Sequence, residues 1–194
     1  MSYGRPLSFN PDEALQAAMD VFWEKGYATT SLQDLLQAMG LSKSSFYQTF
    51  DSKQALFARC FNHYCHWRSG RMQTRLKQSS SGWEFIETVF HAVADGAESD
   101  RERRGCLLMN TASEFGQRDS FIAELVSSGI QCFAAVFCQA VQQAQSEGTI
   151  DPDRDPQALA DFLVSSMSGL RTMVKAGLSH SQTHDIVKNI LRSL

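Results

Sequence analysis

The sequence predicts an all-α protein of about nine helices, arranged as a small N-terminal domain and a larger C-terminal one. Apolar residues recur every three or four positions along most of the chain, as they do in amphipathic helices. No stretch alternates between apolar and polar residues as a strand does, and no segment is repeated. With 194 residues, 43% of them hydrophobic, the chain is long enough for a small domain over residues 1–55 fused to a larger one over residues 56–194.

Start and end signals define the first two helices. Asn10, followed by a proline, is typical of a helix N-terminus, and Gly26 predicts the end of this helix. The second helix begins near Thr30 or Ser31, and Gly40 supplies the turn after it. Two helices and a glycine turn ahead of a third helix make a helix-turn-helix arrangement.

The third predicted helix, residues 41–50, has different chemistry on its two sides. Ser42 is a good N-cap, while Phe46 and Phe50 share a face that should point into a small core. The other faces carry donors that suit phosphates and base edges, so we interpret this segment as a DNA recognition helix. The residues with such donors are Ser42, Lys43, Ser44, Ser45, Tyr47, Gln48 and Thr49.

Six further helices are expected after the third. A cap at Asp51 starts a fourth helix that runs to about Leu76, and the break at residues 78–82 leads into a fifth. Cys106 opens a short sixth helix, and an apolar stretch after it marks a long seventh. Asp155, followed by a proline, starts the eighth helix, and the last apolar residues form a ninth.

The charge of the chain limits how it can contact nucleic acid. A formal net charge of −3 argues against a protein that coats nucleic acid nonspecifically. Residues 1–55 hold Arg5, Lys25, Lys43 and Lys53 against six acidic residues, a net charge of −2. Any contact with DNA must therefore be local.

Nothing in the sequence predicts export or a membrane span. No apolar run approaches the length that crosses a bilayer, and the N-terminus lacks the apolar core of a signal peptide. We therefore expect a cytoplasmic protein with no membrane partner. The five cysteines are odd in number and contain no C-x-x-C pair, which favours reduced thiols over a disulfide framework.

Three segments around the predicted helix-turn-helix carry a family pattern. They are Gly-Tyr-Ala-Thr-Thr-Ser-Leu at 26–32, Met-Gly-Leu-Ser-Lys-Ser-Ser-Phe-Tyr at 39–47 and Phe-Asp-Ser-Lys-Gln-Ala-Leu at 50–56. Over residues 9–56 the chain therefore resembles the TetR/AcrR family of transcriptional regulators. It departs from the family pattern at Leu36 and Met39, where alanine is frequent, and at Thr49, where histidine is common.

The resemblance implies a homodimeric repressor that an effector releases from its operator. Each subunit would place its third helix in a major groove of double-stranded DNA, and the C-terminal domain would hold the effector. We expect no cofactor and no enzymatic activity. By position, the resemblance implies phosphate contacts from Thr30, Tyr47 and Lys53, groove contacts from Lys43, Ser44 and Ser45, and a minor-groove or backbone contact from Arg5.

The C-terminal domain holds candidates for an effector pocket. Aromatic and methionine side chains suit the wall of a pocket for a small hydrophobic ligand, although the same residue types also build a plain core. The pocket candidates are Trp67, Trp83, Phe90, Met109, Phe115, Phe133, Phe137, Met167 and Met173.

The last two long helices hold candidates for a dimer interface. Small residues among large apolar ones would allow these helices to pack closely on a second copy of the chain. The dimer candidates are Leu159, Phe162, Leu163, Ser166, Met167, Leu170, Ile186, Val187 and Ile190.

Cys106 is a candidate sensor thiol. It follows Arg103 and Arg104 near a predicted helix N-terminus, and both features stabilise a thiolate. The Gly-Cys-Leu sequence here resembles a subset of the family that includes electrophile- and oxidant-responsive regulators, with Lys175 as the candidate partner. Three alternatives stay open: a structural cysteine, a small helical enzyme with Cys106 as nucleophile, and a constitutive DNA-binding regulator without an effector.

Cys60, His63, Cys65 and His66 are spaced like some metal ligands, but they do not predict a metal site. Cys60 shares the apolar face of its helix, whereas the two histidines lie toward a different side. One helix cannot direct all four side chains at one ion, so we expect no metal.

Overall fold

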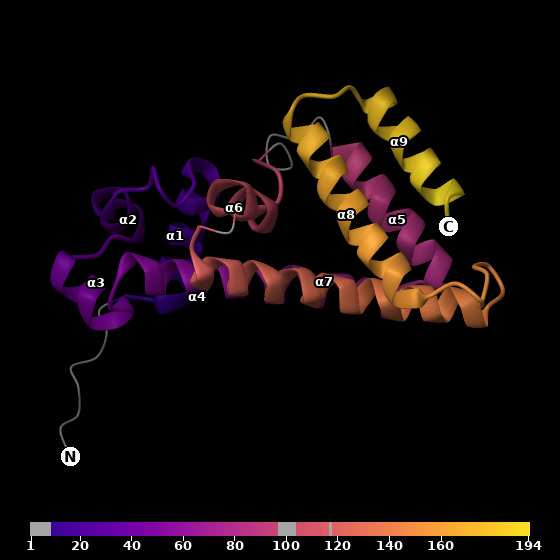
Figure 1. Ribbon diagram of the computed structural model, residues 1–194. Helices are drawn as coiled ribbons and strands as arrows, with labels where there is room; N and C mark the ends of the chain where they lie inside the picture. Colours follow the sequence, from indigo (N-terminus) through magenta and orange to yellow (C-terminus); the bar gives the residue numbers. More distant parts are fainter. Residues whose placement is uncertain (1–8, 97–103, 117) are drawn as a thin grey trace, which may run out of the picture. The chain divides into compact units, whose positions relative to one another are not determined.

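The computed structural model describes residues 9–96, 104–116 and 118–194, and over these residues the protein is all-helical (Figure 1). The helices in this part of the chain are α1 (Pro11–Lys25), α2 (Leu32–Met39), α3 (Lys43–Phe50), α4 (Lys53–Gln78), α5 (Gly82–Asp95), α6 (Leu107–Phe115), α7 (Ser120–Ser146), α8 (Pro156–Lys175) and α9 (His180–Arg192). The predicted fold class and the number of helices are confirmed. The helices form two compact units, one ending at Tyr64 and the other beginning at Cys65, and α4 contributes to both.

The first two helices of the N-terminal unit start and stop at the predicted residues. The Asn10 side chain accepts a hydrogen bond from the backbone N–H of Asp12 (3.0 Å), which caps α1. Ser31 caps α2, and Gly40 ends α2 with a φ of 65°, a left-handed conformation that glycine adopts without strain. Because these signals are local, the sequence alone locates the helix ends.

The start of α4 differs from the prediction. Asp51 does not cap α4 but ends α3, with a φ of 61°. The Ser52 hydroxyl accepts a hydrogen bond from the N–H of Ala55 (3.0 Å), so Ser52 is the capping residue. Two adjacent residues that can both cap a helix explain the one-residue error. The helix then continues two residues past Leu76.

Aromatic side chains form the core of the N-terminal unit. The rings of Phe22 and Phe57 meet edge to face with centroids 5.1 Å apart, and those of Trp23 and Tyr64 do so at 5.0 Å. The unit therefore includes the first turns of α4 and extends past residue 55, where the sequence analysis divided the chain. The buried residues of these turns are Leu56, Phe57, Cys60, Phe61 and Tyr64.

In the C-terminal unit, α5 packs against α7, α8 and α9. One close approach fixes how α5 meets α7. A Cβ atom on Gly82, the first residue of α5, would lie 2.1 Å from the carbonyl oxygen of Ala140 on α7, so no side chain fits there. The Gly82 N–H donates to the Glu147 carboxylate (3.0 Å), which joins the start of α5 to the end of α7.

Among the described helices, α7 is long and apolar enough to cross a membrane, judged by length and composition alone. The prediction that no apolar run approaches this length is therefore wrong for α7. The helix packs against α5, α6 and α8, and one of its faces lies in the core of the C-terminal unit. On that face its apolar residues serve the core, as in a central helix of a globular domain.

Candidate nucleic-acid interface

The helix α3 has an anchored side and an exposed side. Phe46 and Phe50 are fully buried, with ring centroids 5.8 Å apart, as the spacing predicted. The Ser42 hydroxyl accepts a hydrogen bond from the N–H of Ser45 (3.2 Å) and caps the helix. Two aromatic anchors and a cap therefore hold eight residues that would not form a stable helix alone.

The exposed side of α3 carries polar groups and one aromatic ring. Tyr47 is 46% exposed, and its ring meets that of Phe46 edge to face at 5.3 Å, which restrains its direction. The exposed residues are Ser42, Lys43, Ser44, Tyr47 and Gln48, while Ser45 and Thr49 are half-buried. This face offers hydroxyl, amide and ammonium donors of the kinds that contact phosphates and base edges.

An arginine from α4 supports the C-terminal end of α3. Arg59 donates to the backbone carbonyl of Thr49 (3.1 Å), and its guanidinium lies 4.8 Å from the centre of the Phe50 ring. The Thr49 hydroxyl donates to the carbonyl of Ser45 (2.9 Å). The sequence analysis missed Arg59, because nothing in the pattern of the third helix indicates which residue of the fourth one folds back onto it.

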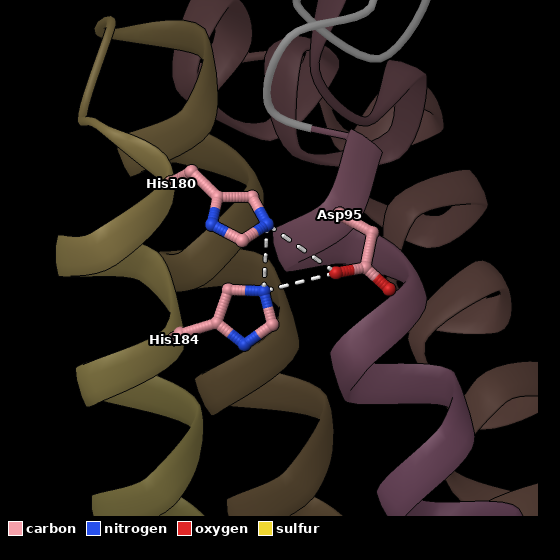
Figure 2. Close-up of side chains that lie close together, drawn as sticks. All are labelled: Asp95, His180 and His184. Atoms are coloured by element: carbon pink, nitrogen blue, oxygen red, sulfur yellow. Dashed lines mark hydrogen bonds and ion pairs between the residues drawn. The ribbon is translucent and has the colours of Figure 1, made fainter.

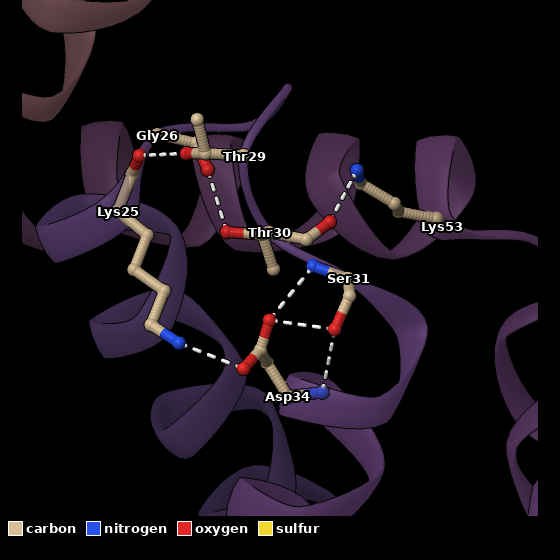
Figure 3. A network of polar contacts seen from close by, with 7 residues as sticks. All are labelled: Lys25, Gly26, Thr29, Thr30, Ser31, Asp34 and Lys53. Carbon is tan, nitrogen blue, oxygen red and sulfur yellow. Dashed lines mark hydrogen bonds and ion pairs between the residues drawn. The ribbon is translucent and has the colours of Figure 1, made fainter.

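Lys53 and Thr30, two of the expected phosphate contacts, lie together (Figure 3). The Lys53 ammonium donates to the backbone carbonyl of Thr30 (2.5 Å) and stands 4.3 Å from the centre of the Tyr27 ring. Thr30 is only 1% exposed, and its hydroxyl donates to the carbonyl of Gly26 (2.5 Å). The Thr30 hydroxyl is therefore used inside the unit, and the expected phosphate contact from Thr30 stays a prediction.

A polar network joins the end of α1 to the start of α2 (Figure 3). Lys25 pairs with Asp34 at 2.7 Å, and Asp34 accepts hydrogen bonds from the backbone N–H and the hydroxyl of Ser31 (2.9 and 2.6 Å). The Lys25 ammonium first, and the Ser31 donors after it, hold the pKa of the Asp34 carboxyl well below its usual value. This network orients α2 ahead of the turn that leads to α3. Arg5, the expected minor-groove contact, lies outside the described residues.

Two of the predicted pocket residues lie in the core of the C-terminal unit. Phe90 and Phe137 are fully buried there, with ring centroids 6.1 Å apart. Trp83 and Met167 pack against the same core. A hollow of about 480 Å³ lies elsewhere in this unit, and its lining contains none of the pocket candidates. It is lined by Arg154, Asp155, Ala158, Leu159, Phe162 and Ser193.

The predicted dimer residues divide into core and surface. Leu163, Leu170 and Val187 are buried inside their own chain, and Leu159 nearly so, which leaves them little surface to offer a second copy. The helical spacing that selected them identifies an apolar face but does not say what covers it. Phe162 is 38% exposed. Half-buried members of the set are Ser166, Met167, Ile186 and Ile190.

Cys106 is the N-cap residue of α6, which confirms the predicted helix start. The side chain of Lys175 lies beside the neighbouring Gly105, while its ammonium donates to the Asn110 side chain (3.1 Å). Asn110 in turn donates to the carbonyl of Arg104 (3.0 Å), so Lys175 supports the segment that carries Cys106. Arg103 lies outside the described residues.

Three other thiols, those of Cys65, Cys132 and Cys138, lie in the same unit as Cys106. Burial raises the pKa of the Cys65 thiol, and the nearby Cys106 and Cys132 thiols raise it further. No disulfide joins any of the five cysteines, all of which lie in the described residues. Among the four residues spaced like metal ligands, Cys60 and Cys65 are buried, whereas His63 and His66 are exposed.

Three short helices, the third with an anchored side and an exposed polar side, define the class of helix-turn-helix DNA-binding proteins. Two family models extend this result. The model of bacterial regulatory proteins of the tetR family matches residues 14–60, and that of the tetracyclin repressor-like C-terminal domain matches residues 82–188. The protein belongs to the TetR family and is a DNA-binding transcriptional regulator.

Relatives of known sequence match along the whole chain. The transcriptional repressor ComR of Escherichia coli K12 is 29% identical over 192 residues, which cover 98% of this chain and 91% of ComR. The transcriptional regulator YezE of Bacillus subtilis 168 is 28% identical over 192 residues, covering 97% of this chain and 99% of YezE.

Solved structures match as well. A cysteine variant of the TetR-family regulator CifR, in complex with 26-bp double-strand operator DNA, has a TM-score of 0.85 at 28% identity and covers 97% of this chain and 98% of its own. The reduced form of Escherichia coli NemR has a TM-score of 0.84 at 17% identity, over 92% of this chain and 93% of its own, and shares the fold.

Proposed function

We propose that the protein is a homodimeric cytoplasmic repressor that binds double-stranded operator DNA through α3 and acts by binding, without enzymatic activity. The observation that carries this proposal is the division of α3 into an anchored side, with Phe46 and Phe50, and an exposed polar side, with Lys43, Ser44 and Tyr47. In this arrangement the side chains that meet DNA are not those that hold the helix in place.

Each exposed residue of α3 has a role set by its chemistry. Lys43, in the first turn, supplies an ammonium to a phosphate or a base edge, and Ser44 supplies a hydroxyl. Tyr47 reaches a backbone phosphate through its hydroxyl, and Gln48 can pair with adenine. Two such helices in a dimer would lie roughly 34–36 Å apart, one turn of the DNA duplex.

Lys53 has a second role in this proposal. Its ammonium holds the carbonyl of Thr30 and stacks on Tyr27, and it also lies in the first turn of α4, where backbone N–H groups favour an anion. A DNA phosphate at this position would contact both the Lys53 ammonium and these backbone N–H groups. Substitution of Lys53 therefore changes stability and DNA binding together, and it is a poor first test of the interface.

The test uses Lys43→Ala and Tyr47→Ala with DNA from upstream of the protein's own gene. Fluorescence anisotropy should show binding weakened about tenfold or more, since a base or phosphate contact is worth about 1–3 kcal/mol. Lys43→Ala should also lower the salt dependence by about one unit if it meets a phosphate. Lys77→Ala, which removes an exposed ammonium from the far end of α4, is the matched control and should bind as the wild type does. Folded variants with unchanged binding and salt dependence would refute the assignment.

A thiol of the C-terminal unit supplies the release signal in this proposal. Cys106 stands at the first turn of α6, where helix N–H groups favour a negatively charged sulfur, and the similar CifR structures are those of cysteine variants. Modification of Cys106 by an electrophile would change the start of α6, which packs against α7. The effect on DNA affinity is then a coupling between two sites.

The thiol is tested by operator binding with and without N-ethylmaleimide. The wild type should be released, and Cys106→Ser should stay bound. Cys138→Ser, which removes another half-buried thiol of the same unit, should behave as the wild type. If Cys106→Ser is released as readily as the wild type, Cys106 is structural and a hydrophobic ligand becomes the effector to seek.

A further inference from the structure

Two histidines and an aspartate converge where α5 and α9 pack together (Figure 2). His180 and His184 lie one turn apart on the same side of α9, and Asp95 is the last residue of α5. Each offers one potential ligand atom, the Nε2 of either histidine and the Oδ1 of the aspartate, and these atoms all lie within 4.8 Å of one another. The sequence analysis did not single out any of the three.

The three potential ligand atoms lie within 3.5 Å of one another. The Nε2 of His184 is 2.9 Å from Oδ1 of Asp95 and 3.0 Å from Nε2 of His180, while His180 Nε2 is 3.5 Å from the same Oδ1. The side chain of His184 is the least exposed of the three, and those of His180 and Asp95 are open to solvent. It is a small triangle of electron-rich atoms.

A single N–H on His184 cannot make good hydrogen bonds to both Asp95 and His180. A neutral imidazole nitrogen carries either an N–H or a lone pair in the plane of its ring, and an ionised carboxylate only accepts. If His184 Nε2 donates to Asp95, its single N–H cannot also point straight at His180. If it accepts from His180, its lone pair points at that N–H and it has no proton to donate to the carboxylate. A cation at the centre would meet three lone pairs at once.

The triangle has the size of one face of a zinc coordination tetrahedron. Zinc bonds to histidine nitrogen and carboxylate oxygen are about 2.0–2.2 Å long, which places tetrahedral ligand atoms about 3.3–3.5 Å apart. The observed separations are 2.9, 3.0 and 3.5 Å, so side-chain movements of a few tenths of an ångström would complete the fit. We propose that Asp95, His180 and His184 bind one zinc-class divalent cation, which holds the start of α9 to the end of α5.

A fourth ligand is close at hand. His91 lies on α5 one turn before Asp95, and its ring centroid is 5.2 Å from that of His184. His91 and Asp95 on α5 therefore face His180 and His184 on α9, each pair four positions apart. Rotation of the His91 side chain, or a water molecule, would supply the remaining position of the tetrahedron.

The ligand set selects the class of metal. Imidazole nitrogen with one carboxylate oxygen suits zinc and the late first-row divalent ions, whereas magnesium and calcium prefer sites built from oxygen alone. Because His184 and Asp95 are 89 residues apart in sequence, the site exists only in the folded C-terminal unit. The bound ion must therefore stabilise that unit. This proposal does not depend on DNA binding.

The test uses the full chain, stripped with a chelator, dialysed and titrated with Zn²⁺ by calorimetry. One ion per chain should bind, and the ion should raise the melting temperature of the protein. His180→Gln and His184→Gln should each lose the binding and the shift, and circular dichroism verifies their fold. His63→Gln and His66→Gln, which replace exposed histidines of α4, are the matched controls and should keep both.

Co²⁺ identifies the ligand atoms. A tetrahedral nitrogen and oxygen site gives visible d–d absorption, whereas a thiolate ligand adds a near-ultraviolet charge-transfer band. Visible absorption that disappears in His184→Gln supports the proposal. No uptake of Zn²⁺ by the wild type, equal uptake by the histidine variants, or a thiolate band that persists in them would overturn it.

Discussion

The contacts inside the N-terminal unit differ in kind from those inside the C-terminal unit. Around its aromatic core, the N-terminal unit has several polar contacts between residues near one another in sequence, such as Lys25 and Asp34. The C-terminal unit packs helices that are far apart in sequence, and its joining contacts span long stretches, as from Gly82 to Glu147. The first kind of contact positions a binding surface, and the second supplies most of a stable core.

The sharpest test of this comparison is Phe137→Ala in the C-terminal core. The Phe137 ring has its centroid 6.1 Å from those of both Phe85 and Phe90, and it is buried. Its removal should lower the free energy of unfolding by about 3–5 kcal/mol, measured by urea denaturation. Phe121→Ala, at a position 41% exposed on the same helix, should cost far less. Equal losses for the two variants would contradict the core assignment.

A smaller effect is expected from Ser31→Ala in the N-terminal unit. The substitution removes the hydroxyl that accepts from the N–H of Asp34 (3.1 Å) and donates to its carboxylate, so the N-cap of α2 is lost. The cost should be about 1 kcal/mol. Hydrogen exchange of α2 amides should speed up while α5 and α7 stay protected, and Ser31→Thr should keep most of the protection. Faster exchange in α5 would show that the two units are not held independently.

The smallest expected effect is on the stability of the protein at low pH. The folded-state pKa of Asp34 is lowered from its ordinary 3.8 by Lys25 and Ser31, so its carboxylate stabilises the fold above that value. This contribution is lost as the pH falls from about 3.8 toward the lowered pKa. Asp34→Asn should therefore lose stability less steeply than the wild type over this range, measured by urea denaturation. Asp185→Asn, at an exposed position of α9, should follow the wild-type curve. A parallel curve for Asp34→Asn would count against the ion pair.

The sequence predicted what local chemistry decides. Asn10, Ser42 and Asp155 cap their helices because a short polar side chain at a helix start has few other uses, and neighbouring residues make the signal clear. The buried side of α3 followed from the spacing of Phe46 and Phe50. For the candidate DNA interface, most of the exposed side chains could therefore be predicted from the sequence.

What depends on distant residues could not be predicted. The pattern around Thr30 does not reveal that its hydroxyl bonds to Gly26, and the apolar spacing of α8 does not distinguish core from dimer surface at Leu163. The cluster of Asp95 with His184 needs two helices 89 residues apart to meet. In the sequence of either helix, the ligand candidates are only a pair of polar residues four positions apart, and such pairs are common.

The separation of the two sides of α3 has a consequence for how such regulators diverge. Lys43, Ser44 and Gln48 are exposed, whereas the anchors Phe46 and Phe50 are buried, and substitutions at exposed sites usually change stability by about 0.5 kcal/mol or less. If these residues read the operator as proposed, operator preference can drift by single substitutions without a loss of folding. After gene duplication, a copy of this chain could acquire a new set of target genes in a few steps.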